Sequence, residues 1–290
     1  MTRNSKKLQR QPTPEFEDSP TPQPPPSAPR QESNPFGLSF VVGTDKVDLP
    51  SEGKYYPRRS CFYQVQQIEI KHMTAREEDI LSSTDAINGD ESVFDKLIDG
   101  LFVERNYKAS ELLDEDKMAI LLKARETGYG KDYKTMSHCQ ACNESTEMIF
   151  DLSKVRTREP KTEALYDPDS DCFSLNLPVS KFPVKVRRLS AEDKKEIDSE
   201  KEKKLSLSLD FNYTLSYLNK AVLSANDVFD PAMLNKFFEI MPAADAKYLL
   251  NFDKDLIPAI DTTQEIECTK CSTMLEREVP LSWAFFRTEF

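Results

Sequence analysis

Two Cys-x-x-Cys motifs place the strongest constraint on how this chain folds. They are Cys139-Gln140-Ala141-Cys142 and Cys268-Thr269-Lys270-Cys271. A Cys-x-x-Cys turn sets two thiolates on one side of a tight knuckle, and four thiolates complete the tetrahedral coordination of a zinc ion at about 2.3 Å per bond. Polar residues and then strand-like alternation follow both motifs. We therefore predict one structural Zn²⁺ held by two zinc-ribbon-like knuckles, with Cys139, Cys142, Cys268 and Cys271 as its ligands.

Three other interpretations of these cysteines remain open. Iron accepts the same four thiolates, although no electron-transfer context accompanies them. A redox-active motif normally opens a helix after a strand, which lowers the pKa of the attacking thiol. Two unligated pairs are the third interpretation. His138 is expected to be exposed or beside the metal, because adjacent residues rarely both reach one ion, and Cys61 and Cys172 are expected to be buried apolar residues.

The same order of elements precedes each motif. Before Cys139 we expect a strand over 62–70, a capping box at Thr74 and Glu77, an apolar helical stripe from Phe94 to Phe102, and a second helix through Met118 and Arg125 that Gly128 and Gly130 end. A strand over 148–152 should follow that motif.

The second series repeats this order. It comprises a strand-like stretch over 177–189, a capping box at Ser190 and Asp193, a helical stripe from Phe211 to Val222, and a helix that begins at Asp230-Pro231. A strand through Val279 should follow Cys271. The pattern predicts an α+β protein with two divergent helical half-repeats joined through the two knuckles.

Proline content divides the chain. Nine of the 19 prolines precede residue 36, with few apolar residues between them. Such a stretch cannot bury enough surface to offset its ordering entropy, so we predict a disordered N-terminal tail over 1–35. The expected body has a first half-repeat over 36–152, a polar linker over 153–172 and a second half-repeat over 173–290.

Charge and composition narrow the function. The formal net charge is −11 with acids and bases mixed around each motif, so neither nucleic acid nor an anionic membrane is an expected partner. No apolar run approaches the ~18 residues of a membrane span, and no apolar segment follows the basic start as in a signal peptide. We therefore expect a reducing cytoplasm, where cysteines more often bind metal than pair.

Few residues suited to catalysis are present. The chain has two histidines and seven glycines and no phosphate-binding glycine loop. A four-thiolate zinc has no open coordination position for water or substrate. Acid clusters at 77–79 and 114–116 lie where helices should start, and there they complement the helix dipole. We predict that the protein is not an enzyme.

The last ten residues are rich in aromatic side chains. This segment either packs onto the second half of the chain or forms an apolar patch that faces a partner. The candidate partner-binding residues are Trp283, Phe285, Phe286 and Phe290.

A series of short motifs over residues 48–152 resembles the baseplate hub assembly proteins of T4-type contractile-tailed phages. The motifs are Leu49-Pro50-Ser51-x-Gly53-x-x-Tyr56, Met73-Thr74-x-x-Glu77-Glu78-x-Ile80-Leu81, Asp116 with Leu121-Leu122, Arg125 and Tyr129-Gly130, and the first Cys-x-x-Cys. The resemblance implies a non-enzymatic factor that helps to build the central hub of the tail, and it supplies no catalytic residues.

Several expectations follow from this resemblance. The protein would act by contacts with hub or tape-measure proteins, as a hub component or a tape-measure chaperone. It would work in the cytoplasm of the bacterial host, with retention in the virion baseplate as a second outcome. The alternative function is a cellular zinc-ribbon adaptor of transcription or translation machinery, and a thiol oxidoreductase is a third interpretation.

Overall fold

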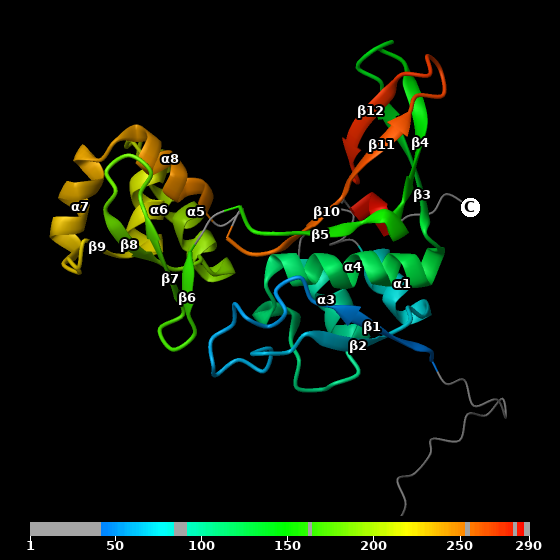
Figure 1. The fold of residues 1–290 in the computed structure, drawn as a ribbon, viewed down its shortest axis with the longest axis horizontal. Helices are drawn as coiled ribbons and strands as arrows, with labels where there is room; N and C mark the ends of the chain where they lie inside the picture. The colour runs from blue at the N-terminus through cyan, green and yellow to red at the C-terminus, as the bar shows by residue number, and fades with distance from the viewer. Residues whose placement is uncertain (1–41, 84–91, 162–163, 253–255, 281–282, 287–290) are drawn as a thin grey trace, which may run out of the picture. The chain divides into compact units, whose positions relative to one another are not determined.

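The computed structural model describes residues 42–83, 92–161, 164–252, 256–280 and 283–286. The tail predicted over 1–35 lies outside these ranges. The described chain is a mixed α+β structure with small antiparallel sheets, so the predicted fold class is confirmed at that level (Figure 1). None of the described helices has the length and apolar composition needed to cross a bilayer.

The buried apolar residues form two clusters, which we call the first core and the second core. The first core is built mainly from the N-terminal part of the described chain. Its elements are β1 (Thr44–Asp48), β2 (Gln67–Lys71), α1 (Ala75–Leu81), α3 (Ser92–Leu101), η1 (Ala109–Glu111), α4 (Asp114–Tyr129), β3 (Asp132–His138), β4 (Ser145–Asp151) and η2 (Leu152–Lys154).

The second core includes a four-stranded antiparallel sheet with strand order β6-β7-β8-β9. Its elements are β6 (Leu165–Asp167), β7 (Cys172–Asn176), β8 (Pro183–Val186), α5 (Ala191–Ser206), α6 (Tyr213–Ala221), β9 (Val222–Ala225), α7 (Pro231–Ile240) and α8 (Ala243–Asn251).

The chain then returns to the first core. This last part comprises β10 (Ala259–Asp261), β11 (Thr263–Glu267), β12 (Met274–Glu278) and η4 (Trp283–Phe286). β10 pairs with β5 (Arg156–Arg158), the strand by which the chain leaves the first core. Ile266, Val279 and Phe285 are buried in the first core.

The second core is therefore inserted between two parts of the first. The predicted second half-repeat over 173–290 groups residues 259–286 differently, because Ile266, Val279 and Phe285 pack in the first core. That division of the chain stays a prediction. The segment 153–172, expected to be a polar linker, contains η2, β5 and β6. β-pairing explains this difference, because β5 gains a partner about a hundred residues away and β6 pairs with the next strand, β7, and composition reveals neither pairing.

Several local predictions are confirmed. Thr74 and Glu77 form a capping box at the start of α1, and Gly130 ends α4, whereas Gly128 lies inside that helix. The strand predicted over 62–70 covers only 67–71, because residues 62–65 form a turn. Pro231 occupies the first turn of α7 behind the Asp230 cap, as expected.

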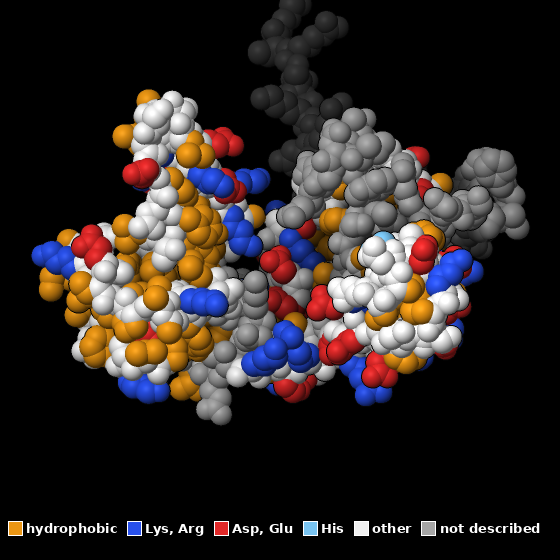
Figure 2. Space-filling view, turned by 90° about the horizontal axis from the view of Figure 1, so that it is seen from above, with side chains coloured by type: hydrophobic (Ala, Val, Ile, Leu, Met, Phe, Trp, Pro, Cys, Tyr) orange, Lys and Arg blue, Asp and Glu red, His pale blue; other side chains and the backbone are white. Residues whose placement is uncertain are grey.

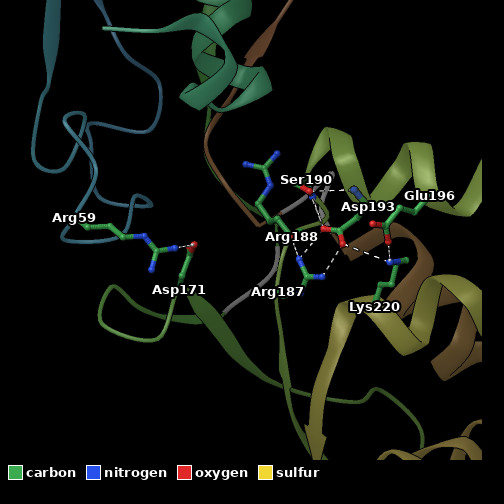
Figure 3. A network of polar contacts seen from close by, with 8 residues as sticks. All are labelled: Arg59, Asp171, Arg187, Arg188, Ser190, Asp193, Glu196 and Lys220. Atoms are coloured by element: carbon green, nitrogen blue, oxygen red, sulfur yellow. Dashed lines mark hydrogen bonds and ion pairs between the residues drawn. The ribbon is translucent and has the colours of Figure 1, made fainter. Parts of the chain in front are cut away.

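The second capping box belongs to a larger polar network at the start of α5 (Figure 3). The Ser190 side chain accepts a hydrogen bond from the Asp193 backbone N–H, and the Asp193 carboxylate accepts one from the Ser190 N–H. Arg187 adds two hydrogen bonds to Asp193, at 2.7 and 2.9 Å. This fork holds the pKa of Asp193 well below its ordinary value, and the bonds from Ser190 act in the same direction.

Each core contains a Leu-Pro turn held by a buried aspartate. Asp116, in the first turn of α4, accepts the Ser51 N–H at 3.0 Å through Oδ1. Asp245, in the first turn of α8, accepts the Val179 N–H at 2.8 Å through the same oxygen. Both aspartates are fully buried. Ser51 and Val179 each directly follow the proline of a Leu-Pro pair, and both aspartates stand 23 residues before the first cysteine of a Cys-x-x-Cys motif.

Candidate metal centre

Two antiparallel hairpins carry the four candidate ligands. β3 pairs with β4, and the last pair of the ladder, His138↔Ser145, leaves the first motif in the connecting loop. β11 pairs with β12 in the same way, and Glu267↔Met274 leaves the second motif at the equivalent place. The two hairpins lie side by side (Figure 1). The predicted meeting of two distant knuckles is therefore present.

The four Sγ atoms form one compact cluster. All of them lie within 4.8 Å of one another. The Cys139–Cys271 and Cys142–Cys268 sulfur atoms are 3.8 and 3.9 Å apart, so the close pairs join different knuckles. Four sulfurs at about 2.3 Å from a central zinc lie about 3.8 Å apart in a regular tetrahedron. A disulfide would need about 2.05 Å, so the spacing matches a tetrahedral metal site.

The backbone of both knuckles has the same form. In the first, the Asn143 N–H donates to the Cys139 carbonyl and the Cys139 N–H donates to the Glu144 carbonyl, both at 2.9 Å. In the second, Ser272 and Cys268 make the corresponding bonds at 2.9 and 3.0 Å. Asn143 and Ser272 have φ values of 61° and 55°, so each knuckle closes through a left-handed residue. Because such a conformation is uncommon outside glycine, its recurrence indicates one knuckle geometry built twice.

Local hydrogen bonds favour the thiolate form of two ligands. The backbone N–H groups of Cys142 and Ala141 lower the pKa of the Cys139 thiol. The hydroxyl and backbone N–H of Thr273 lower the pKa of Cys271 to about 6. The thiolate is the form that binds a metal.

Contacts below the knuckles hold the hairpins together. The Gln264 side chain accepts the Asp151 N–H at 2.9 Å and donates to the Asp151 carbonyl at 2.8 Å. Thr146 and Thr269 share a hydroxyl hydrogen bond beside the cluster. Sequence reasoning did not identify these residues, because a glutamine or threonine carries no spacing signal of its own.

The expectations for the other two cysteines and for His138 are met in part. Cys172 is buried, but Cys61 is only partly buried. His138 is exposed, and its Nε2 lies 2.9 Å from the Asn143 Oδ1 and not against a sulfur of the cluster.

The aromatic C-terminal segment lies elsewhere. Phe285 is buried in the first core, where its carbonyl accepts a hydrogen bond from Arg125 Nε at 2.9 Å and its ring packs edge-on against Tyr133. Phe286 is also buried and packs against Phe94. The chain's own first core covers both rings, and partner binding by Phe285 and Phe286 stays a prediction.

The remaining partner-binding candidates stay predictions. The Trp283 side chain and Phe290 lie outside the part of the chain that the structure describes.

A cavity of about 810 Å³ is lined by residues of both cores, among them Tyr55, Tyr166 and Phe173. Three of its basic side chains have carboxylate partners: Arg187 with Asp193, Arg188 with Glu115, and Lys117 with Asp95, at 2.7, 3.2 and 2.6 Å. These ion pairs neutralise the three cations, and the pair between Arg188 and Glu115 joins segments 73 residues apart in sequence.

Comparison with known proteins identifies a family. No curated protein and no solved structure matches the chain. Residues 44–281 match the family described as T4 bacteriophage base plate protein. This range includes both Leu-Pro turns, both buried aspartates and all four clustered cysteines, and it covers most of the chain. The chain therefore belongs to the T4 bacteriophage base plate protein family.

Proposed function

We propose that the protein is a non-enzymatic factor in the assembly of the phage baseplate hub, and that one structural zinc ion fixes its fold. It would act in the host cytoplasm by contacts with hub or tape-measure proteins, as a chaperone or as a hub component. The family match over residues 44–281 is the observation that carries this proposal.

The chemistry of the four-cysteine cluster supports zinc as the resident metal. Its sulfur spacing matches a tetrahedral thiolate site, and four protein ligands leave no position open for a substrate. Such a metal would act on the fold and not on a reaction. It would join the β3–β4 hairpin, which precedes the second core in the sequence, to the β11–β12 hairpin, which follows it.

We further propose that the two cores arose from one duplicated unit. The Leu-Pro turn, the capping box, the aspartate that accepts the N–H after the proline, and the knuckle recur in this order. The 23-residue spacing from aspartate to cysteine supports this origin, because an insertion anywhere between them would have changed it.

Metal analysis tests the zinc site. Purified wild-type chain should contain one zinc per molecule by elemental mass spectrometry, and Cys139→Ser and Cys268→Ser should each abolish this stoichiometric binding. Cys172→Ser is a matched control, because Cys172 is buried outside the cluster. One metal retained by each knuckle after the other is mutated would contradict the shared site.

A deletion phage tests the assembly role. Without this gene, infected cells should make heads but no functional tails, with hub intermediates missing or stalled. The protein should also co-purify with hub or tape-measure proteins on co-expression. Normal tails in the deletion phage would disprove the proposed function.

A further inference from the structure

The two Leu-Pro turns differ by one segment. Leu49 donates its N–H to the carbonyl of Gln66, the residue just before β2. Leu177 donates its N–H to the carbonyl of Phe182, the residue just before β8. The first turn therefore spans 17 residue steps and the second spans 5. The fourth residue after each leucine, Gly53 or Lys181, has a positive φ of 68° or 59°.

The extra twelve residues of the first turn are 54–65. They follow Gly53, whereas Phe182 directly follows Lys181, so the insertion lies at one point of an otherwise matched turn. Segment 54–65 is rich in aromatic residues, and Tyr56 and Phe62 within it are 2% and 0% exposed. Tyr56 also donates a hydrogen bond to Asp116, the residue that holds the turn.

Segment 54–65 packs on the first turn at Gly53. The Gln64 N–H donates to the Gly53 carbonyl at 2.8 Å, and the backbone of Gln64 and Val65 fills the space that a Cβ at Gly53 would need. Pro50, Ser51 and Gly53 are all buried. The aromatic rings of this segment continue into the first core, where Phe62 stacks on Tyr107 at 4.8 Å between centroids. In the first core an aromatic segment thus packs on the Leu-Pro turn.

The second turn lacks such a segment, and its apolar side chains are exposed. Val179 and Phe182 are 55% and 41% exposed, and Pro178 is exposed beside them. The patch continues onto the following elements. The Asn226 N–H donates to the Pro183 carbonyl, which brings the β9–α7 loop, with Phe229 60% exposed, next to the turn.

α7 extends the same patch. The Phe182 ring packs on Phe237 with centroids 5.8 Å apart, and Met233, one helical turn earlier, is 54% exposed. Figure 2 shows hydrophobic side chains gathered over the second core. Contiguous exposed apolar surface of this kind marks an interaction site more often than isolated residues do.

We propose that this patch, formed by the second Leu-Pro turn, Phe229 and Met233, binds an aromatic segment of a partner baseplate protein. The bound segment would take the place that segment 54–65 occupies on the first turn. Tyr and Phe side chains suit this role, because they bury a large apolar area and lose little conformational entropy on binding. The inference rests on the proposed assembly function and adds the place and chemistry of the contact.

Paired variants provide the test. Val179→Ser/Phe229→Ser should weaken binding to the hub or tape-measure protein of the same phage by about tenfold or more in co-expression pull-downs and titrations of purified proteins. Leu165→Ser is the matched control, because Leu165 is 79% exposed on β6, at the opposite edge of the same sheet. All three side chains are exposed, so both variants should keep the wild-type melting temperature.

A photocrosslinker identifies the occupant. Benzoylphenylalanine at position 229 of the full-length chain should crosslink to a partner peptide that contains Tyr or Phe. A crosslink to a second copy of this chain, or to a peptide without an aromatic residue, would overturn the inference.

The variants separate this inference from the proposed function. Full wild-type binding and normal tails with Val179→Ser/Phe229→Ser would overturn the docking site and leave the assembly role intact. Normal tails in the deletion phage would overturn both.

Discussion

Gln264 hydrogen-bonds to both backbone polar groups of Asp151 and so joins the β11–β12 hairpin to the β3–β4 hairpin. A side-chain amide has an acceptor oxygen and a donor NH₂ group. The Gln264 amide therefore makes the two hydrogen bonds to Asp151 that the backbone of a neighbouring strand would otherwise make. The contact lies at the base of the two hairpins that carry the four clustered cysteines, where β4 ends and β11 begins.

Gln264→Ala should lower the free energy of unfolding by about 1–3 kcal/mol, because it leaves two partly buried backbone groups without their partner. Chemical denaturation of the metal-loaded protein measures this change. Glu265→Ala, at the exposed neighbouring position, should change stability by less than about 0.5 kcal/mol. Equal stability of wild type and Gln264→Ala would show that the hydrogen bonds between Gln264 and Asp151 contribute nothing to the stability of the fold.

The aspartate that holds the first Leu-Pro turn gives a second prediction. Asp116 accepts three hydrogen bonds, from the Ser51 N–H, the Ser51 hydroxyl and the Tyr56 hydroxyl. Asp116→Ala should cost about 3–5 kcal/mol, because it leaves buried donors unpaired, and Tyr56→Phe should cost about 1–2 kcal/mol. Thermal melts monitored by circular dichroism measure both, and a smaller loss for Asp116→Ala than for Tyr56→Phe would contradict the central place of the carboxylate.

A third prediction concerns acid stability. The Arg187 fork depresses the pKa of Asp193 in the folded state, so this carboxylate stabilises the fold fully above its unfolded pKa of about 4. The contribution is lost as pH falls from there towards the lower folded pKa. Arg187→Gln should therefore be less stable than wild type at pH 7, and the difference between the two should shrink below pH 4.

Burial raises the pKa of Asp116, so that group works in the opposite sense. Its protonation favours the fold as pH falls. Arg187→Gln leaves Asp116 unchanged. The difference between the unfolding free energies of wild type and Arg187→Gln at each pH therefore isolates the contribution of Asp193. A stability difference that stays constant between pH 7 and pH 3 would exclude the linkage.

The C-terminal aromatic residues give a fourth prediction. Phe285→Ala should lower the unfolding free energy by about 3–5 kcal/mol, because the ring is 1% exposed and packs on Arg125 and Tyr133. Trp283→Ala tests the remaining partner-binding prediction and should weaken association without a comparable loss of stability. Differential scanning fluorimetry and co-expression pull-downs measure the two effects separately.

The sequence predicts local features of this protein better than its connectivity. The capping boxes at Thr74 and Ser190, the end of α4 at Gly130 and the start of α7 at Pro231 depend on a few neighbouring residues, and all are confirmed. The meeting of the two knuckles is predictable as well, because one tetrahedral ion needs four ligands.

Long-range pairing explains what the sequence does not predict. Nothing in the composition of residues 153–172 shows that β5 meets β10 about a hundred residues later. The aromatic composition around Phe285 and Phe286 leaves packing and partner binding both open, and only the structure shows the contacts of the two rings with Arg125, Tyr133 and Phe94 in the first core. The equal spacing of Asp116 and Asp245 from the cysteines was visible in the sequence, and its meaning depends on the turns that the two residues hold.

The antiparallel pairing of β5 with β10 sets Arg158 opposite Ala259, so the chain leaves the first core and re-enters it at neighbouring points. A loop of a few residues is enough to connect two antiparallel strands, so the pairing of β5 with β10 does not depend on the residues between them. The second core is thus an insertion. We expect that a short loop can replace it, with its exposed apolar turn, while the four-cysteine cluster and the first core keep their connectivity.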